Sequence, residues 1–280
     1  MKCNFFSAVR QWRHYSGYSY RNIINDSFSL GFDIPQVVEY FFKIPPTYGL
    51  DGKTVLFVSD LHYSDGKVDP GIFKRIIEKL SPDWIVFGGD IVSYACFIDE
   101  VFLWLKNAFA DFKDIPKIAV FGNWDRRRRW FPNRVWFEKY KESGFTLLVN
   151  EELIIDRVRF YGIDEPRTGN PVLDPGKFDS TCLNCFVSHS IEPVIDTVTQ
   201  SGISGNNLVL CGHSHGGQIR IPLFGAVLTS TPYWKLFEYG HYAHKKSNID
   251  MIVTSGMGMS RFPVRLFCHP EVVIIRFKEC

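Results

Sequence analysis

Short apolar runs alternate with longer amphipathic segments between residues 54 and 149. Thr54–Val58 is rich in β-branched and aromatic side chains and is bounded by turn residues, which is typical of a buried strand. Asp69 and Pro70 are residue types that begin a helix, and apolar residues recur on one face from there to Leu80. The same alternation predicts further strands at 84–87, 117–121 and 145–149 and further helices at 97–109 and 136–141. This βαβαβαβ order favours an α/β fold with a largely parallel sheet.

The second half of the chain has a different pattern, in which short apolar runs follow one another without helical segments between them. Residues 153–155 and 158–161 are close enough in sequence to form a hairpin. Further strands are predicted at 185–187, 208–211, 218–221, 251–254 and 272–277. A second, more β-rich sheet is therefore expected. The chain shows no internal repeat or low-complexity linker, so we assign residues 51–280 to one domain and residues 1–50 to an N-terminal extension.

The extension mixes basic and aromatic residues, and its five Lys and Arg residues are Lys2, Arg10, Arg13, Arg21 and Lys43. Such a segment can lie in a membrane interface, or it can pack on the domain, and the sequence leaves both open. The arginines interrupt any apolar stretch of the kind found in a cleavable signal peptide. Nowhere does an uncharged apolar run approach the roughly 18 residues of a transmembrane helix, so none is expected.

Composition narrows the class of protein. The 280 residues carry 32 Lys and Arg against 30 Asp and Glu, and a net charge of +2 gives no electrostatic basis for bulk nucleic-acid binding. A hydrophobic fraction of 45% with 22% charged residues is typical of a globular protein. Seven irregularly spaced cysteines indicate a reducing compartment, so we expect a cytoplasmic location. The aromatic fraction of 16%, with 25 Phe, is high and concentrates in the extension and around residues 121–137.

Polar residues that can bind metals occur where loops leave the predicted strands, which is where α/β folds place their sites. The five clusters are Ser59–His62, Gly88–Asp90, Gly122–Asp125, Ser188–Ser190 and Gly212–Gly217. Each alone is weak, because an Asp after a strand is often a cap and a His is usually structural. Together they supply the ligands Asp60, His62, Asp90, Asn123, His189, His213 and His215. Carboxylates mixed with imidazoles suit a dinuclear centre of Mn, Fe, Zn or Mg, with Asp90 placed to bridge.

The order Asp-x-His, Gly-Asp, Gly-Asn-x-Asp, His and Gly-His-x-His resembles the calcineurin-like metallophosphoesterase superfamily, over about Leu50 to Phe277. Gly212–Pro222 and the segment around Gly256 are similar to its YkuE-like subgroup. The resemblance implies a four-layer α/β/β/α sandwich of two mixed sheets, with residues 51–280 as the catalytic domain. It implies two metal ions, Mn²⁺ first among the candidates. One ion would be held by Asp60, His62, Asp90 and His215, and the other by Asp90, Asn123, His189 and His213. Among these, Asp60, Asp90, Asn123 and His189 are expected to act in catalysis.

One motif residue departs from the family pattern. Where the family usually has Gly-Asn-His-Asp, this chain has Trp124, and an indole cannot protonate a leaving oxygen. A phosphate leaving from a pyrophosphate has a low pKa and needs no such acid. One lineage of UDP-2,3-diacylglucosamine pyrophosphatases, in lipid A biosynthesis, resembles this chain in lacking that His. We therefore expect hydrolysis of UDP-2,3-diacylglucosamine to UMP and 2,3-diacylglucosamine 1-phosphate (lipid X). The alternatives are a broad phosphodiesterase or phosphatase and a non-catalytic interaction module.

Substrate contacts are expected beside the Asn123 loop. Four successive arginines, 126–129, follow that loop, and two of them are expected on a solvated face while one or two can grip a phosphate or anionic lipid headgroups. The residues expected to contact substrate are Trp124, Asp125, Arg126, Arg129 and Arg261. Asp125 can instead orient a metal ligand, and Arg265 can join the substrate contacts. We expect peripheral contact with the inner membrane, no nucleic-acid partner and no obligate protein partner.

Overall fold

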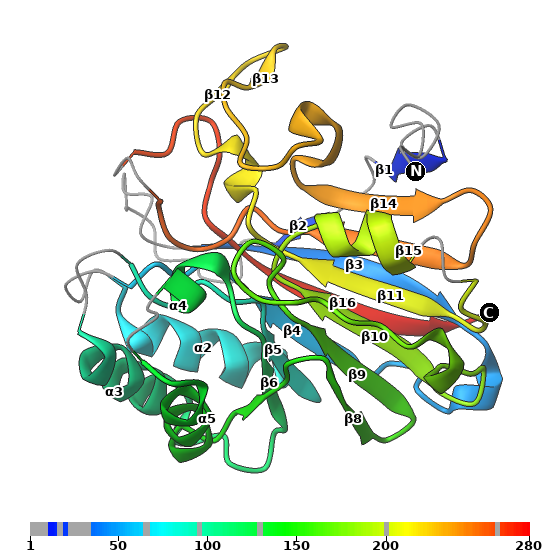
Figure 1. Cartoon of the computed structure of the whole chain (residues 1–280), viewed down its shortest axis with the longest axis horizontal. Helices are drawn as coiled ribbons and strands as arrows, with labels where there is room; N and C mark the ends of the chain where they lie inside the picture. Colours follow the sequence, from blue (N-terminus) through cyan, green and yellow to red (C-terminus); the bar gives the residue numbers. More distant parts are fainter. Residues whose placement is uncertain are drawn as a thin grey trace.

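A computed structural model describes residues 11–15, 19–21, 35–63, 68–93, 97–127, 131–198, 202–260 and 264–280 of the chain (Figure 1). Two seven-stranded mixed sheets face each other at its centre. Sheet 1 contains, in spatial order, β2 (Ser19–Arg21), β3 (Gln36–Ile44), β16 (Glu271–Glu279), β4 (Thr54–Val58), β5 (Trp84–Phe87), β6 (Lys117–Ala119) and β7 (Thr146–Leu147). Sheet 2 contains β1 (Trp12–Tyr15), β14 (Gly240–His244), β15 (Ile249–Val253), β11 (Asn207–Cys211), β10 (Leu183–Ser188), β9 (Val158–Ile163) and β8 (Glu151–Ile155).

Helices cover the outer face of sheet 1 (Figure 1). They are α2 (Pro70–Leu80), α3 (Ile98–Phe109) and α5 (Asn133–Glu142). Helix α2 begins as its sequence predicts, because the Asp69 side chain accepts a hydrogen bond from the Gly71 N–H and Pro70 occupies the first turn. Its buried face is Ile72, Phe73, Ile76 and Ile77. This apolar face packs on strand residues such as Leu56 and Val58, which alternate with residues facing the other way.

The second core lies between the two sheets. Val55 and Phe57 of β4 point into it, where they meet Phe160 of β9 and Leu210 of β11. Fully burying an aromatic or aliphatic side chain of this kind contributes roughly 1.5–3 kcal/mol. The buried strands of both sheets therefore read as continuous apolar runs, which is why the sequence located them.

The outermost layer covers the other face of sheet 2. It consists of short turns, the π-helical Val194–Val198 and the 3₁₀ segment Trp234–Phe237, packed on Tyr161, Phe186 and Val209. The expected α/β architecture of two mixed sheets with helices is confirmed. The fourth layer is thinner than an α-helical layer, because these covering segments are only one turn long.

Strand β3 lies within the stretch that we assigned to an N-terminal extension. It pairs along its full length with β16, from Gln36 beside Glu271 to Ile44 beside Glu279, and most of its residues are buried. The division at residue 50 stays a prediction about domains, but residues 36–44 are an integral part of sheet 1. Within the described residues, no helix is long and apolar enough to cross a membrane.

Candidate metal centre

Seven potential ligands leave strands of both sheets at one edge of the sandwich. Asp60 and His62 follow β4, Asp90 follows β5, and Asn123 follows β6 in sheet 1. His189 follows β10, and His213 and His215 follow β11, in sheet 2. These strands run parallel within each sheet, so their carboxyl ends meet at the same edge. All seven side chains are buried, and residues far apart in the sequence therefore form one site.

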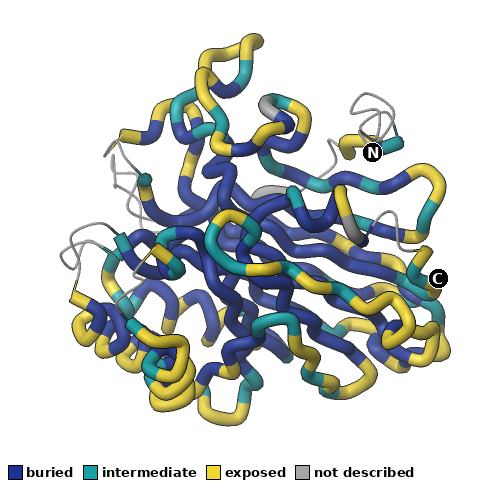
Figure 2. Tube along the Cα trace, viewed as in Figure 1, coloured by how far each residue is buried: buried dark blue, intermediate teal, exposed yellow. Residues whose placement is uncertain are grey.

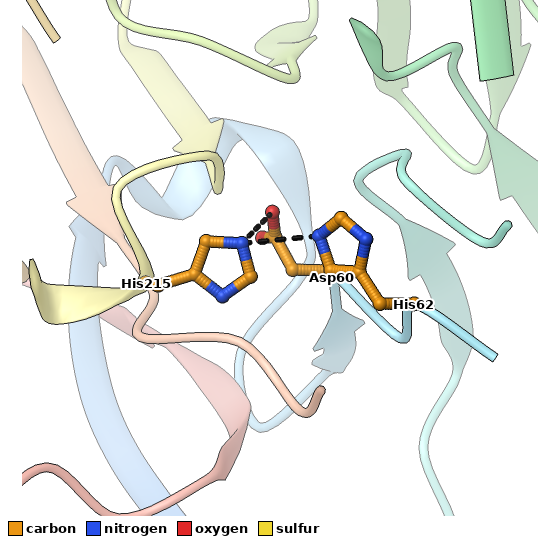
Figure 3. Close-up of side chains that lie close together, drawn as sticks. All are labelled: Asp60, His62 and His215. Atoms are coloured by element: carbon orange, nitrogen blue, oxygen red, sulfur yellow. Dashed lines mark hydrogen bonds and ion pairs between the residues drawn. The ribbon is translucent and has the colours of Figure 1, made fainter. Parts of the chain in front are cut away.

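Asp60, His62 and His215 form the first cluster (Figure 3). The Nε2 atoms of His62 and His215 are 3.1 Å apart, and His215 Nε2 lies 3.4 Å from the Asp60 carboxylate oxygen Oδ1. Figure 3 shows the two imidazoles on opposite sides of that carboxylate. Two ring nitrogens that face each other this closely repel unless a proton or a cation lies between them.

Asp90, His189 and His213 form the second cluster. His189 Nε2 is 3.2 Å from Asp90 Oδ2 and 3.2 Å from His213 Nδ1. Asp90 Oδ2 is also 3.5 Å from His62 Nε2 of the first cluster. The Asp90 carboxylate therefore lies between the two clusters, which is the position of a bridging ligand.

The donor atoms of this site fit divalent cations. The side-chain oxygen Oδ1 of Asn123 is buried and has no hydrogen-bond partner among the described residues. The geometry assigns the Nδ1 proton of His189 to the Gly88 carbonyl at 2.8 Å, and the Nε2 proton of His213 to the Ser230 carbonyl at 3.3 Å. His189 Nε2 and His213 Nδ1 then face the cluster, as in metal sites where an outer hydrogen bond fixes the ring orientation. Burial would lower the pKa of His189, but the Asp90 charge and hydrogen bond outweigh it and raise that pKa to about 10. Without a bound ion His189 Nε2 therefore carries a proton, which a metal ion would displace.

Burial and charge set the protonation of these ligands. Burial lowers the pKa of His213 to about 3, and it also lowers the pKa of His62 and His215, so these imidazoles are neutral and able to bind metal. Burial alone would raise the pKa of Asp90, but the neighbouring His189 charge and hydrogen bond outweigh it and lower that pKa to about 2. Asp90 is therefore ionised, as a bridging ligand must be.

The backbone of the ligand loops adopts an uncommon conformation. Five ligands have positive φ angles: Asp60 (55°), His62 (44°), Asp90 (54°), His213 (68°) and His215 (52°). Such left-handed conformations cost an L-residue roughly 1–2 kcal/mol each. The ligand loops also pack tightly on one another. A Cβ added to Gly122, for example, would overlap the Asp90 carboxylate. Residues in this conformation concentrate at functional sites, where the surrounding structure holds them.

Asp125 holds two of these loops together. Its buried carboxylate accepts hydrogen bonds from the backbone N–H groups of Asp90 (2.9 Å), Ile91 (3.1 Å), Val92 (3.3 Å) and Gly122 (2.8 Å). Burial, followed by the charge of Asp90, raises its pKa to about 7, although the hydrogen bonds from Gly122 and Val92 oppose the shift. Asp125 is thus placed to orient a ligand loop, the second of the two roles we considered, and its oxygens are occupied within the protein.

A third loop supports Asp60 from behind. The Met257 and Gly258 N–H groups donate to the carbonyls of Ser59 (3.0 Å) and Asp60 (2.7 Å). Arg265 was a possible substrate contact in the sequence. It is buried, and its guanidinium donates to the carbonyls of Ser255 and Gly258. Arg265 therefore stabilises the loop that holds Asp60.

A cavity of about 340 Å³ opens over the two clusters. Asp90, Asn123, His213 and His215 line its polar floor. Its walls contain an aromatic ring, two arginines and an apolar strip. The ring is Trp124, the arginines are Arg127 and Arg167, and the strip is Ile219, Val227 and Leu228. The Trp124 ring lies edge-on to His62, with ring centres 5.7 Å apart, and the Arg127 guanidinium lies 5.1 Å from the centre of the Trp124 ring.

The expected substrate contacts have different places. Trp124 lines the cavity, and its contact with substrate stays a prediction. Arg126 instead bonds Asp164 at 2.6 Å and lies over the Phe121 ring. Arg129 and Arg261 lie outside the described residues. Sequence reasoning did not select Arg127. Arg126 and Arg127 are neighbours on the short helix α4 (Asn123–Arg127), so a shift of one residue changes which of them faces the cavity. Sequence reasoning also missed Arg167, which lies in a loop with no motif.

Comparison with known proteins agrees with this geometry. The family described as calcineurin-like phosphoesterase matches residues 53–217, more than half of the chain. The chain belongs to this family. It is 27% identical over 244 residues to the uncharacterized metallophosphoesterase YkuE of Bacillus subtilis, covering 83% of this chain and 81% of that protein. It is 29% identical over 237 residues to phosphodiesterase YaeI of Escherichia coli, covering 79% of this chain and 80% of that protein.

Family membership confirms two predictions, a phosphoesterase of this superfamily and a hydrolase. The family depends on two metal ions, and the two adjoining clusters are where this chain can hold them. The mixed nitrogen and oxygen ligands suit Mn²⁺, Fe, Zn²⁺ or Mg²⁺.

Proposed function

We propose that this hydrolase cleaves the pyrophosphate of UDP-2,3-diacylglucosamine, releasing UMP and 2,3-diacylglucosamine 1-phosphate, a step of lipid A biosynthesis. Water attacks the phosphorus bonded to uridine, and the lipid 1-phosphate leaves. The observation that carries this proposal is Trp124, which occupies the cavity wall where the family motif has a histidine.

The residues around the cavity favour a leaving group that departs without a proton. Among the described residues that line it, both histidines, His213 and His215, belong to ligand clusters. The remaining cationic side chains, Arg127 and Arg167, carry guanidinium groups, which donate hydrogen bonds to phosphate but do not serve as general acids. An alkoxide leaves poorly under these conditions, whereas a phosphate leaves well. Two divalent cations held by the clusters of Asp60 and Asp90 would polarise phosphoryl oxygens and lower the pKa of a bound water.

The cavity walls have the chemistry of an amphiphilic substrate. Arg127 and Arg167 can bind phosphate oxygens through paired N–H donors. Ile219, Val227 and Leu228 form an apolar strip in the lining of the same cavity. A cavity of about 340 Å³ accommodates a headgroup rather than two acyl chains, so the chains would extend past the strip.

We extend the proposal to the cellular setting of the reaction. A diacylated substrate resides in a membrane, so the enzyme would act in the cytoplasm at the surface of the inner membrane, with Mn²⁺ as the first metal to test. No nucleic-acid or obligate protein partner is required for this chemistry.

A broad phosphodiesterase is the second candidate, and the name of the Escherichia coli relative favours it. Separate assays of the two substrates distinguish the two candidate functions. Purified chain with Mn²⁺ would receive UDP-2,3-diacylglucosamine in detergent and, separately, a generic aryl phosphodiester. The proposal expects kcat/KM for the UDP-lipid to exceed that for the aryl ester at least about a hundredfold. Absence of UMP together with rapid hydrolysis of the aryl ester would establish the second candidate.

A further inference from the structure

The hairpin of β12 (Arg220–Ile221) and β13 (Gly225–Ala226) projects from the body of the molecule (Figure 1). Ile219 and Val227, which flank it in the chain, line the cavity of the metal centre. Its tip carries exposed apolar side chains, with Leu223 fully exposed and Phe224 at 58% exposure. Figure 2 shows the tip as exposed chain. Of the seventeen large apolar side chains that are exposed in the described part of the chain, ten fall between residues 221 and 267, so the concentration is local.

A second turn joins the same surface. Ile219 forms a β-bridge with Leu266, and the Leu266 N–H donates to the Gln218 carbonyl at 3.0 Å. Phe267, at 62% exposure, shares a surface groove with Leu223 and Phe224. The docking surface is defined here as the apolar side chains of these two turns, and its members are Ile221, Leu223, Phe224, Leu266 and Phe267.

Backbone strain marks the two most prominent positions of this surface. The Phe224 N–H donates to the Ile221 carbonyl at 3.1 Å, which closes a turn with Pro222 and Leu223 at its centre. Leu223 has a φ of 68° where such a turn favours Gly or Asn, and Phe267 has a φ of 50°. The sequence thus retains bulky apolar residues where they are both strained and exposed to water. Neither feature stabilises the isolated chain.

The charges around the docking surface fit a lipid bilayer with anionic headgroups. Residues 218–237 and 255–270 contain no Asp or Glu. Arg220 is paired with Glu238 at 2.5 Å, and Lys235 donates to the Phe224 carbonyl at 2.8 Å and lies over the Phe224 ring. Glu238 lines the same groove as the tip, but its carboxylate is paired with Arg220. A projecting apolar tip with a basic side chain beside it has the composition of an interfacial membrane anchor.

The docking surface is also continuous with the cavity. Ile219, Val227 and Leu228 line the cavity, and the hairpin lies between Ile219 and Val227 in the chain. The ligand His215 precedes this segment, and Gly217 packs so closely on Ala226 that a Cβ there would overlap it. A bilayer contacting the tip would therefore adjoin the apolar wall of the metal centre.

From these observations we propose that the β12–β13 hairpin and the Leu266–Phe267 turn insert into the interface of an anionic membrane. This places the membrane contact on a surface other than the N-terminal extension and the residues 121–137 considered from the sequence. Of the latter, Phe121 and Trp136 are core residues.

The test is flotation of the full chain with vesicles of phosphatidylethanolamine and phosphatidylglycerol. The variant Leu223→Asn/Phe267→Asn removes two apolar side chains at positions whose backbone favours Asn, so folding is preserved. The matched control is Phe97→Asn, which removes an aromatic side chain of 72% exposure at a helix N-cap where Asn is favoured. Neither variant touches the cavity.

The proposal expects the wild type and Phe97→Asn to float with the vesicles, and the double variant to bind at least about tenfold more weakly. Hydrolysis of a soluble aryl phosphodiester should be equal in all three. Equal flotation of the double variant, or no flotation of the wild type, would overturn the proposal. A wild-type dimer in solution that dissociates in the double variant would instead make this a surface for a second copy. UMP release in detergent is measured separately, so failure here leaves the proposed function standing.

Discussion

Two regions of this molecule place non-glycine residues in the left-handed conformation, for different reasons. In the metal centre, Asp60, Asp90 and His213 adopt it in full burial, and hydrogen bonds from neighbouring loops hold them. In the docking surface, Leu223 and Phe267 adopt it in water. The first set is stabilised inside the protein, and its carboxylates and imidazoles lie close together, where they can bind a cation. The second set has apolar side chains directed outward. We infer that the cost of its backbone strain is offset by contact with a partner outside the chain.

The comparison suggests that strain becomes informative when it is combined with burial and chemistry. Buried strained residues that carry carboxylates and imidazoles indicate a metal site. Exposed strained residues that carry apolar side chains indicate a contact surface. Each of the following changes tests one side of this contrast.

Loss of Asp90 should have the largest effect. Asp90→Ala removes the carboxylate shared by the two clusters, so kcat/KM should fall by at least about a thousandfold and bound metal should fall from two ions to one or fewer per chain. Metal analysis and steady-state kinetics measure this. Asp69→Asn, an exposed helix cap, is the control and should change neither. Retained activity in the Asp90 variant would remove the metal centre from the account.

Asp125→Asn should lower the free energy of unfolding by about 2–4 kcal/mol, because the amide cannot accept all four backbone bonds and turns N–H groups toward donors. Urea denaturation measures it. Asp174→Asn, which caps an exposed turn through one bond to Gly176, should cost much less. Equal costs for the two variants would show that Asp125 does not hold the ligand loops.

Trp124→His restores a group able to protonate a leaving oxygen. Hydrolysis of alkyl phosphodiesters should rise by about tenfold to a hundredfold relative to the UDP-lipid, with bound metal unchanged. Trp124→Phe keeps an aromatic wall without an acid and should leave the ratio as it is. If Trp124→His altered no ratio between substrates, the leaving-group explanation would fail.

Arg127→Met and Arg167→Met should each raise KM for the UDP-lipid by about tenfold with a smaller change in kcat, because both arginines line the cavity. Arg134→Met is the control, since its side chain is exposed on α5 and pairs only with Glu138 in the described structure. An unchanged KM in both cavity variants would place the phosphates elsewhere.

The smallest expected effect is a stabilisation, whereas most substitutions destabilise a protein. Leu223→Asn alone should raise the free energy of unfolding by about 0.5–1 kcal/mol, because Asn tolerates the positive φ that Leu resists. Thermal unfolding in the absence of lipid measures it. A destabilised variant would show that Leu223 contributes to folding, and the contrast between the two strained regions would disappear.

Much of the fold was predictable because the central strands of both sheets are buried on both faces and read as apolar runs. The positions of the ligands were predictable because they follow those strands directly. The place of β3 in sheet 1 could not be predicted, because its pairing with β16 joins residues more than two hundred positions apart. The side of α4 on which each arginine falls, and the exposure of Leu223 within an apolar stretch, depend on tertiary packing that local pattern does not encode.

We propose that two cations held by the joined clusters act on a lipid-linked pyrophosphate. Metal-free chain titrated with Mn²⁺, while ³¹P NMR follows UDP-2,3-diacylglucosamine, tests it directly. UMP and the lipid monophosphate should appear together, and the rate should saturate at two Mn²⁺ per chain. Saturation at one ion, hydrolysis without metal, or no UMP at saturating metal would contradict it.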